Sequence, residues 1–342
     1  MNYNLDASNV VDYLSFQGLI RPKDVTSVQS LGWGISNTLV KVSTQDECMV
    51  VKQSLPKLRV AEDWFADQGR IFRERACIDT LGAILPAGIL PTIRYEDEEN
   101  FLFVMSCAPA GGANWKEQLL SGQVDADVAE KVGAVLGMVH SATAGVAAIH
   151  EQFIDDTPFV QLRIDPYHWT TAKAHPDLAE IINAEAQRML EVKTALVHGD
   201  YSPKNIIVTG KDIFLLDFEV VHYGNPVFDL AFLLNHLLLK AIYNAHIRED
   251  YFKAVSSFWE GYNSENPHVS VERDTVKQLG CLMLARIDGK SPAEYIVKPD
   301  TKDTVRSIAR SILLDDLSTL KGVTELVNAV LSLPGSFQRD PV

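Results

Sequence analysis

The stretch from residue 197 to residue 219 constrains this chain more than any other. It contains two short apolar runs, residues 206–208 and 213–216, separated by the turn Gly210-Lys211-Asp212. Short apolar runs joined by a glycine-containing turn predict a tight β-hairpin. Because the residues that flank a hairpin meet at its open end, the side chains just outside the two runs are expected to lie close together.

Those flanking side chains are polar. Asp200 and Asn205 precede the first predicted strand, and Asp217 and Glu219 follow the second. Antiparallel pairing is expected to bring Asn205 close to Asp217, with Asp200 on the adjoining loop. Converging oxygen ligands suit a hard cation such as Mg²⁺, and a carboxylate beside such a metal can orient a hydroxyl and accept its proton. We therefore predict Asn205, Asp217 and Glu219 as metal ligands and Asp200 as the catalytic base.

The order of these residues resembles a known family. His198-Gly199-Asp200, then Asn205, then Asp217-Phe218-Glu219 is similar to the aminoglycoside phosphotransferase/choline kinase superfamily. The resemblance implies an ATP-dependent kinase that phosphorylates a hydroxyl of a small molecule, such as a sugar, an amino sugar or an amino-alcohol. The resemblance also implies that this kinase uses Mg²⁺, while the choice between ATP and GTP as the phosphoryl donor stays open. His198 is expected at the catalytic site, as a support of the loop rather than a reactant.

The resemblance also implies an α+β, bilobal, protein-kinase-like fold. A small β-rich N-lobe is expected over residues 1–107 and a larger helical C-lobe over residues 108–342, with a hinge near residues 104–112. Asp229, at the start of the helix that follows Pro226, is expected to hydrogen-bond back to the catalytic loop.

The N-terminal third offers a plausible nucleotide site. Two predicted strands flank a glycine-containing loop at residues 32–37, and a third strand ends in Lys52. A helix over residues 68–81 offers Glu74 as a partner for Lys52, although Arg70, Arg73 and Arg75 leave other pairings open. Taken singly, the loop is also an ordinary hairpin tip and Lys52 an ordinary edge lysine. The predicted nucleotide-binding residues are Gly32, Gly34, Ser36, Asn37, Lys52, Glu74 and, through hinge backbone groups, Met105 and Cys107.

Two segments are candidates for binding the acceptor substrate. Residues 162–169 are polar and aromatic between helices, and either line a substrate cleft or form a packed turn. Residues 285–295 resemble the segment in which methylthioribose kinase, a branch of the superfamily, carries two substrate-binding arginines; here Ala285 replaces the first. The predicted substrate residues are Arg163, Asp165, Tyr167 and Arg286.

The remaining pattern predicts mostly helices. A hairpin is expected from residues 91–97 and 101–105, and helices over residues 6–18, 115–120, 125–143, 176–193, 249–263, 271–287 and 301–332.

Composition limits the partners and the compartment. The net charge of −14 argues against a nucleic-acid partner and leans slightly toward a cationic substrate. No signal peptide is visible, and residues 228–242 are too short and polar to cross a membrane. Four scattered cysteines without CxxC spacing predict reduced thiols and a cytoplasmic protein, monomeric or homodimeric: Cys48, Cys77, Cys107 and Cys281.

Two other function classes compete with a small-molecule kinase. A metal-dependent hydrolase would use Asp200, Asp217 and Glu219 on a bound water, but it would not need Lys52 or the glycine loop. A catalytically inactive nucleotide-binding module is the other alternative, and the presence of every chemical position argues against it. A protein kinase is disfavoured because no Ala-Pro-Glu motif follows Asp217.

Overall fold

The structure is a computed structural model that describes residues 4–32, 36–57, 59, 65, 67–266, 270–315 and 317–333. It divides into two compact units. The first unit comprises Met1–Gly111 and Phe214–Val220, and the second comprises Gly112–Ile213 and Val221–Val342. The short segment after the predicted hairpin therefore belongs to the N-terminal unit. The lobe boundary predicted between residues 107 and 108 stays a prediction.

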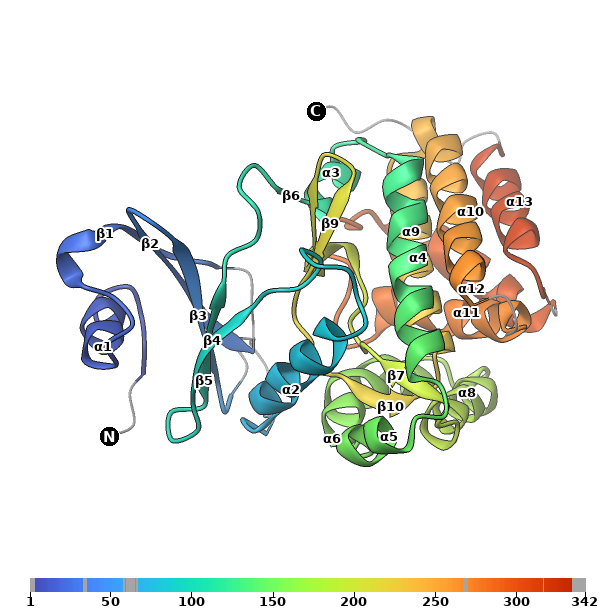
Figure 1. The fold of residues 1–342 in the computed structure, drawn as a ribbon. Coiled ribbons are helices and arrows are strands. Elements are labelled where there is room, and N and C mark those ends of the chain that lie inside the picture. The colour runs from blue at the N-terminus through green and yellow to red at the C-terminus, as the bar shows by residue number, and fades with distance from the viewer. Residues whose placement is uncertain are drawn as a thin grey trace. The chain divides into compact units, whose positions relative to one another are not determined.

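The first unit is built on a five-stranded antiparallel sheet in the order β1-β2-β3-β5-β4 (Figure 1). This is the small β-rich region that the resemblance implied, and the predicted hairpin at residues 91–105 is confirmed. The elements of this unit are α1 (Val10–Phe16), β1 (Val25–Ser30), β2 (Asn37–Thr44), β3 (Cys48–Ser54), α2 (Arg70–Gly82), β4 (Ile93–Asp97) and β5 (Leu102–Ser106).

Helix α1 packs against this sheet. Val10, Tyr13 and Leu14 are buried in one apolar cluster with residues of β2, β3 and β5. The helix is shorter than the predicted span 6–18, because the Asp6 carboxylate accepts the backbone N–H of Ser8 at 2.7 Å and holds a local turn there. Its predicted stop is confirmed, since Gly18 adopts a φ of 72°.

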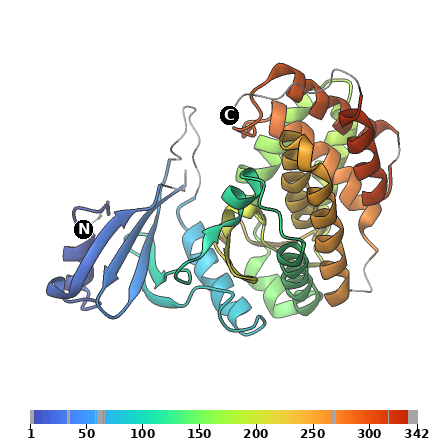
Figure 2. The same cartoon turned by 90° about the horizontal axis from the view of Figure 1, so that it is seen from above.

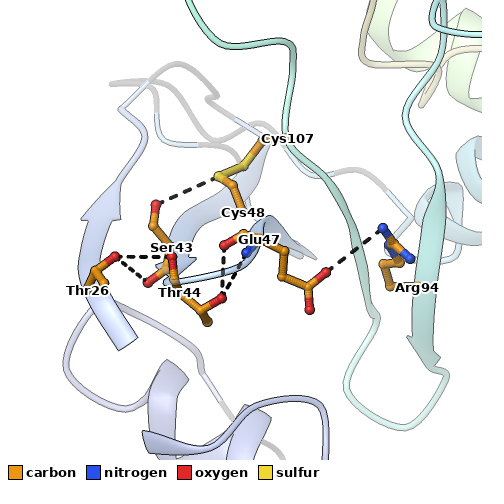
Figure 3. Close-up of a disulfide and its surroundings, with 7 residues drawn as sticks. All are labelled: Thr26, Ser43, Thr44, Glu47, Cys48, Arg94 and Cys107. Atoms are coloured by element: carbon orange, nitrogen blue, oxygen red, sulfur yellow. Dashed lines mark hydrogen bonds and ion pairs between the residues drawn. A yellow bond between two sulfur atoms is a disulfide. The ribbon is translucent and has the colours of Figure 1, made fainter. Parts of the chain in front are cut away.

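A disulfide between Cys48 and Cys107 joins the start of β3 to the residue that follows β5 (Figure 3). The prediction of four reduced thiols was therefore wrong for this pair. Antiparallel β3 and β5 pair Met49 with Ser106, which brings the two cysteines to neighbouring positions with a Cα–Cα separation of 5.5 Å. Sequence spacing gave no sign of this because 59 positions separate them. Cys77 and Cys281 are buried and form no disulfide with each other.

The second unit is mainly helical. Figure 2 shows its long helices lying side by side. The close approach of α4 and α10 depends on glycine, because a Cβ at Gly133 would lie 2.0 Å from the Phe258 carbonyl oxygen. The helices are α3 (Trp115–Leu120), α4 (Ala126–Thr143), α5 (Ala147–Phe153), α6 (Thr157–Phe159), α7 (Thr170–Ala174), α8 (Ala179–Glu191), α9 (Val227–Tyr243), α10 (Arg248–Glu265), α11 (Glu272–Asp288), α12 (Pro299–Leu314) and α13 (Leu320–Leu331).

Short strands complete this unit. The predicted central hairpin is confirmed as β8 (Ile206–Thr209) and β9 (Asp212–Leu215), which form a three-stranded sheet with β6 (Ala113–Asn114). The turn between β8 and β9 uses Gly210 at a φ of 62°, a conformation that favours glycine. A second pair joins β7 (Ala195–Val197) to β10 (His222–Gly224).

Two predictions about local structure in this unit need correction. The segment at residues 162–169 is not a turn but lies in a π-helix, η2 (Val160–Trp169), which contains Pro166 and continues directly into α7. The single helix predicted over residues 301–332 is two helices, α12 and α13. The second begins at the Thr319 N-cap, whose hydroxyl accepts the backbone N–H of Gly322.

Within the described ranges, no single helix is both long enough and apolar enough to span a membrane; two sharply bent helix pairs meet that test only jointly.

Candidate active site

Lys52 is the centre of a buried ionic group in the first unit. It lies on β3, is 2% exposed, and its Nζ lies 2.6 Å from Glu74 Oε2 on α2 and 2.6 Å from Asp217 Oδ1. The predicted pairing of Lys52 with Glu74 is therefore present. Asp217 adopts a φ of 70°, in the left-handed region, and 22% of its side chain is exposed.

Burial and charge oppose each other in this group. Burial alone would lower the pKa of Lys52, but the carboxylates of Asp217 and Glu74 raise it above its ordinary value, so the lysine is charged at neutral pH. Burial raises the pKa of Glu74 to about 7, although the charge of Lys52 acts in the opposite direction. The group thus carries more carboxylates than Lys52 alone neutralises.

Glu219 is held by three donors of the same unit. Its Oε1 accepts the Ser36 hydroxyl at 2.6 Å, and its Oε2 accepts Asn37 Nδ2 at 2.9 Å and Arg70 Nε at 3.1 Å. These contacts join the segment after β9 to the start of β2, beyond the glycine loop. The carboxylate predicted as a metal ligand, and two side chains predicted to bind nucleotide, therefore contact one another.

Arg70 is the residue of this group that sequence reasoning did not assign. It is 1% exposed and also donates to the carbonyl oxygens of Ser36 at 2.6 Å and Leu55 at 3.0 Å. The only sequence signal was the group of three arginines around Glu74, which did not show which arginine turns inward.

The remaining nucleotide candidates have simpler surroundings. Gly32 lies in a turn after β1, whereas Gly34 lies outside the described residues. Met105 is in β5, opposite Val50. The Cys107 backbone N–H donates to the Cys48 carbonyl at 3.3 Å, so this hinge donor already has an acceptor.

In the second unit, Asp229 holds the loop that carries His198-Gly199-Asp200. Its carboxylate accepts the backbone N–H of His198 at 2.7 Å and that of Gly199 at 2.9 Å. The predicted contact from the first turn of α9 is thereby confirmed. Gly199 has a φ of 76°, and the His198 ring accepts the Asp200 backbone N–H through Nδ1 at 3.2 Å. The loop geometry is thus set on both sides of Asp200.

Asp200 is 3% exposed and contacts two cations. Its Oδ2 lies 3.0 Å from an Arg163 guanidinium nitrogen and 2.8 Å from Lys204 Nζ. Asn205 Nδ2 donates to the Asp200 backbone carbonyl at 3.0 Å. That bond uses the amide nitrogen of Asn205, and no donor from the described part of the chain contacts its amide oxygen. Lys204 was not predicted; its only sequence signal is its place between Asp200 and Asn205.

Three of the four predicted substrate residues form a continuous set near Asp200. The Arg163 guanidinium lies 5.9 Å from the centroid of the Tyr167 ring, and the Tyr167 hydroxyl lies 3.4 Å from an Arg286 nitrogen. Although burial would raise the pKa of Tyr167, Arg286 and Arg163 lower it below its ordinary value. Asp165 is more exposed and pairs with Lys290 at 2.6 Å.

Asp200 and Asn205 belong to the second unit and Asp217 to the first, so their predicted convergence on one metal stays a prediction. Within the described residues, no three His, Cys, Asp or Glu side chains gather as a metal-binding group.

Comparison with known proteins identifies the family. A model of the phosphotransferase enzyme family matches residues 27–267, which is well over half of the 342 residues. The chain belongs to the phosphotransferase enzyme family. The match spans the sheet that carries Lys52 and the loop that carries Asp200.

Relatives of this phosphotransferase are small-molecule kinases. Methylthioribose kinase of Bacillus cereus (strain B4264) is 21% identical over an alignment of 351 positions, gaps included, that covers 88% of each chain. Methylthioribose kinase of Bacillus mycoides (strain KBAB4) is 22% identical over 70% of this chain and 67% of its own.

Solved structures share the fold. The amicoumacin kinase hAmiN, solved with AMP-PNP, Ca²⁺ and Ami, has a TM-score of 0.61 at 14% identity, covering 90% of this chain and 94% of its own. A choline/ethanolamine kinase family protein from Mesorhizobium loti has a TM-score of 0.52 at 12% identity, covering 89% and 93%. The protein-kinase-like fold predicted from the motifs is confirmed.

These comparisons make the chain an ATP-dependent small-molecule kinase, a phosphotransferase with an alcohol group as acceptor. They give no support to the metal-dependent hydrolase that the sequence left as an alternative.

Proposed function

We propose that the chain transfers the terminal phosphoryl group of ATP to a hydroxyl of a small molecule, with Asp200 as the residue that receives the hydroxyl proton. The observation that carries this proposal is the loop geometry. Asp200 is buried, Asp229 fixes the loop through two backbone bonds, and no other carboxylate occupies that loop. A carboxylate held in this way is preorganised to orient a hydroxyl.

The two cations on Asp200 fit a late proton transfer. Arg163 and Lys204 lie within ion-pair distance of the Asp200 carboxylate, where they interact favourably with its negative charge. A weak base suffices for phosphoryl transfer through a loose transition state, in which the attacking hydroxyl keeps its proton until late. In the proposal, Asp200 accepts a hydrogen bond from the acceptor hydroxyl and takes its proton as the new P–O bond forms.

Lys52 is proposed to contact the nucleotide phosphates, with Glu74 fixing its position. Glu219 is proposed to anchor Ser36 and Asn37 where β2 begins, because its carboxylate accepts hydrogen bonds from both side chains and from Arg70. This revises its expected role as a metal ligand. The fixed lysine and loop would act by positioning and charge neutralisation.

The donor set fits Mg²⁺. Three carboxylates of the first unit, Glu74, Asp217 and Glu219, face two cations, Lys52 and Arg70, which leaves an excess of negative charge. Asp217 is the most exposed of the three, and Asn205 offers an amide oxygen without a donor among the described residues. We propose Asp217 and Asn205 as the ligands. Bound Mg²⁺ would neutralise charge on the phosphate oxygens, which supply its remaining ligands along with water.

The test is ADP release with Mg²⁺-ATP across a panel of sugars, aminoglycosides, choline, ethanolamine and homoserine. We expect one class of acceptor to stimulate ADP release, and we expect Asp200→Ala to lower that rate by about 10²–10⁴-fold because the base is lost. Asp212→Ala is the matched control, because Asp212 is exposed on the adjoining hairpin and pairs with the surface residue Lys131. Near-normal turnover in Asp200→Ala would remove Asp200 as the base.

The metal assignment has its own test. Asp217→Ala should weaken the binding of Mg²⁺ and nucleotide. The Mg²⁺ concentration needed for the half-maximal rate should therefore rise. An unchanged Mg²⁺ dependence would place the metal elsewhere. Nucleotide binding without turnover of any acceptor would instead favour the inactive binding module.

A further inference from the structure

Three cations of the second unit gather around one carboxylate. Lys116 lies on α3, Lys240 on α9 and Arg286 on α11, and we call these three residues the cationic cluster. Lys116 pairs with Glu294, and an Arg286 nitrogen lies 4.0 Å from another oxygen of the same carboxylate. With Lys240 protonated, the cluster carries three positive charges against one negative charge.

Lys240 is the least compensated member. It is 0% exposed, and its Nζ donates to the His236 backbone carbonyl at 3.3 Å and lies 5.2 Å from the centroid of the Tyr295 ring. No carboxylate in the described part of the chain lies within ion-pair distance of it. A buried ammonium without a carboxylate is costly, so a bound anion beside Lys240 would stabilise its charged form.

Arg286 is also incompletely satisfied. One guanidinium nitrogen donates to Ser291, through both its carbonyl and its hydroxyl. Its Nε is buried, and within the described residues it has no hydrogen-bond partner. Because the residue is only 7% exposed, this nitrogen is an unpaired donor in a nearly dry setting. An arginine with a spare donor beside other cations is suited to a planar or tetrahedral oxyanion.

Glu294 marks where such an anion can lie. Its carboxylate contacts both Lys116 and Arg286, yet its side chain is 60% exposed and its contact with Arg286 is long. A loosely held surface carboxylate is easily displaced, because an exposed ion pair contributes little. A ligand oxyanion can therefore take the position between the two cations.

The cluster connects to Asp200 through side-chain contacts inside the second unit. Arg163 joins Asp200 to the rings of Tyr167 and Phe232, and the Tyr167 hydroxyl reaches Arg286. On α9, Phe232, His236 and Lys240 follow one another at intervals of four residues and therefore share a helix face. The Phe232 and His236 ring centroids are 5.3 Å apart. The cluster thus lies at the far end of a row that begins at the proposed base.

We propose that the acceptor is an anion, namely a small hydroxyl compound that bears a carboxylate or phosphate group. Arg286 and Lys116 bind this group in place of Glu294, and the buried Lys240 adds a third positive charge nearby. This inference rests on the proposed function, because it assigns the acceptor of the same site. It runs against the weak preference for a cationic substrate that the acidic composition suggested.

The titration of Lys240 gives this binding mode a distinct signature. Burial, followed by the charges of Arg286 and Lys116, lowers the pKa of Lys240 to about 7, and only Glu294 acts in the opposite direction. A bound anion stabilises the ammonium form. Binding at pH 8 is therefore coupled to proton uptake by Lys240, with His236 and Tyr295 as the other titratable groups facing it.

The experiment is isothermal titration calorimetry at pH 8, with Mg²⁺-ADP present to occupy the nucleotide site. The probes are two matched sets: ribose against ribose 5-phosphate, and glycerol against glycerate and glycerol 3-phosphate. We expect the anionic member of at least one set to bind about tenfold or more tightly than its neutral partner. The second set separates a carboxylate preference from a phosphate preference. Repeating the titration in buffers of different ionisation enthalpy measures proton uptake.

Three variants decide whether the cationic cluster is responsible for anion binding and for the proton uptake. Lys240→Met keeps the length of the side chain and should abolish proton uptake and lower anion affinity by about 10–100-fold. Glu294→Gln should raise anion affinity, because it removes the competing carboxylate. Lys253→Met is the control for lysine removal, since the Lys253 side chain is 71% exposed on α10 and pairs with the exposed Asp250.

The outcomes separate this inference from the proposed function. Equal affinity for neutral and anionic probes, or anion binding unchanged by Lys240→Met and Glu294→Gln, would overturn the inference. Turnover of only neutral or cationic acceptors would overturn it as well, while the kinase proposal would stand. The reverse result, tight anion binding through the cluster without any phosphoryl transfer, would support the anion site but count against the kinase proposal, and with it against the anion as the acceptor.

Discussion

Lys52 in the first unit and Lys240 in the second are both lysines with almost no exposed surface, but their surroundings differ. Lys52 lies within 2.6 Å of two carboxylates. Lys240 has a backbone carbonyl and an aromatic ring. The cost of burying a charge is offset where carboxylates of the protein pair with it, whereas a buried charge without such a partner destabilises the fold unless the group loses its proton. The comparison therefore separates a lysine whose charge the protein itself compensates from one whose charge it does not.

The largest expected effect is that of Lys52→Met. Removing this cation leaves Glu74 and Asp217 without their common partner, which should lower the free energy of unfolding by about 3–5 kcal/mol. Urea denaturation followed by circular dichroism measures the change. Lys23→Met is the control in the same unit, because Lys23 is exposed. If Lys52→Met is as stable as the control, the matched and unmatched lysines do not differ as described.

Loss of the Cys48–Cys107 disulfide is expected to cost somewhat less. The bridge closes a loop of 59 positions, and in the chain-entropy account its removal lowers the free energy of unfolding by up to about 4 kcal/mol. Thermal unfolding with and without dithiothreitol measures this. The Cys48→Ser variant should be insensitive to the reductant. If the reductant leaves the wild-type melting temperature unchanged, the result would argue against the disulfide and in favour of the reduced thiols predicted from sequence.

The pH dependence of stability should show the unmatched lysine directly. An unfolded lysine binds its proton up to about pH 10.5, whereas Lys240 in the folded chain releases it near pH 7. Between these values the unfolded chain binds more protons, so this residue makes stability rise with pH by up to about 1.4 kcal/mol per unit. The slope between pH 7 and 9 should be smaller in Lys240→Met. Equal slopes in the two proteins would mean that Lys240 is matched by a charge after all.

The smallest expected effect sets the scale for the loss of one helix N-cap. Asp125 caps α4 by accepting the backbone N–H groups of Asp127 and Val128. Asp125→Ala should lower the free energy of unfolding by about 1 kcal/mol. Urea denaturation again provides the measurement. A loss as large as that of Lys52→Met would show that single-site changes in this chain do not report on charge matching.

Local patterns predicted the elements and the central loop well. The turn at Gly210 and the strand that carries Lys52 follow from residues whose chemistry is visible within a few positions, whereas the contact from Asp229 was implied by the family resemblance. Where several side chains competed for a local role, prediction was weaker. The α1 N-terminus moved because Asp6 forms its own turn, and the break before α13 depends on a single cap at Thr319.

Long-range contacts account for the rest. The disulfide depends on the register of β3 with β5, and the hold of Arg70 on Glu219 joins segments 149 positions apart. The cationic cluster brings together α3, α9 and α11, which lie far apart in sequence. Its visible signals were Arg286, which was predicted to bind substrate, and Lys240 inside a mainly apolar helix. Sequence showed these side chains, but not what they faced.

Phosphorus NMR of a reaction mixture tests the central claim most directly, namely that the chain moves a phosphoryl group onto an acceptor hydroxyl. The mixture contains the chain, Mg²⁺-ATP and an acceptor that stimulates ADP release. The account predicts a new phosphomonoester resonance that grows in equal amount with ADP and is absent with Asp200→Ala. Growth of inorganic phosphate alongside ADP, with no phosphomonoester, would show hydrolysis instead and contradict the account.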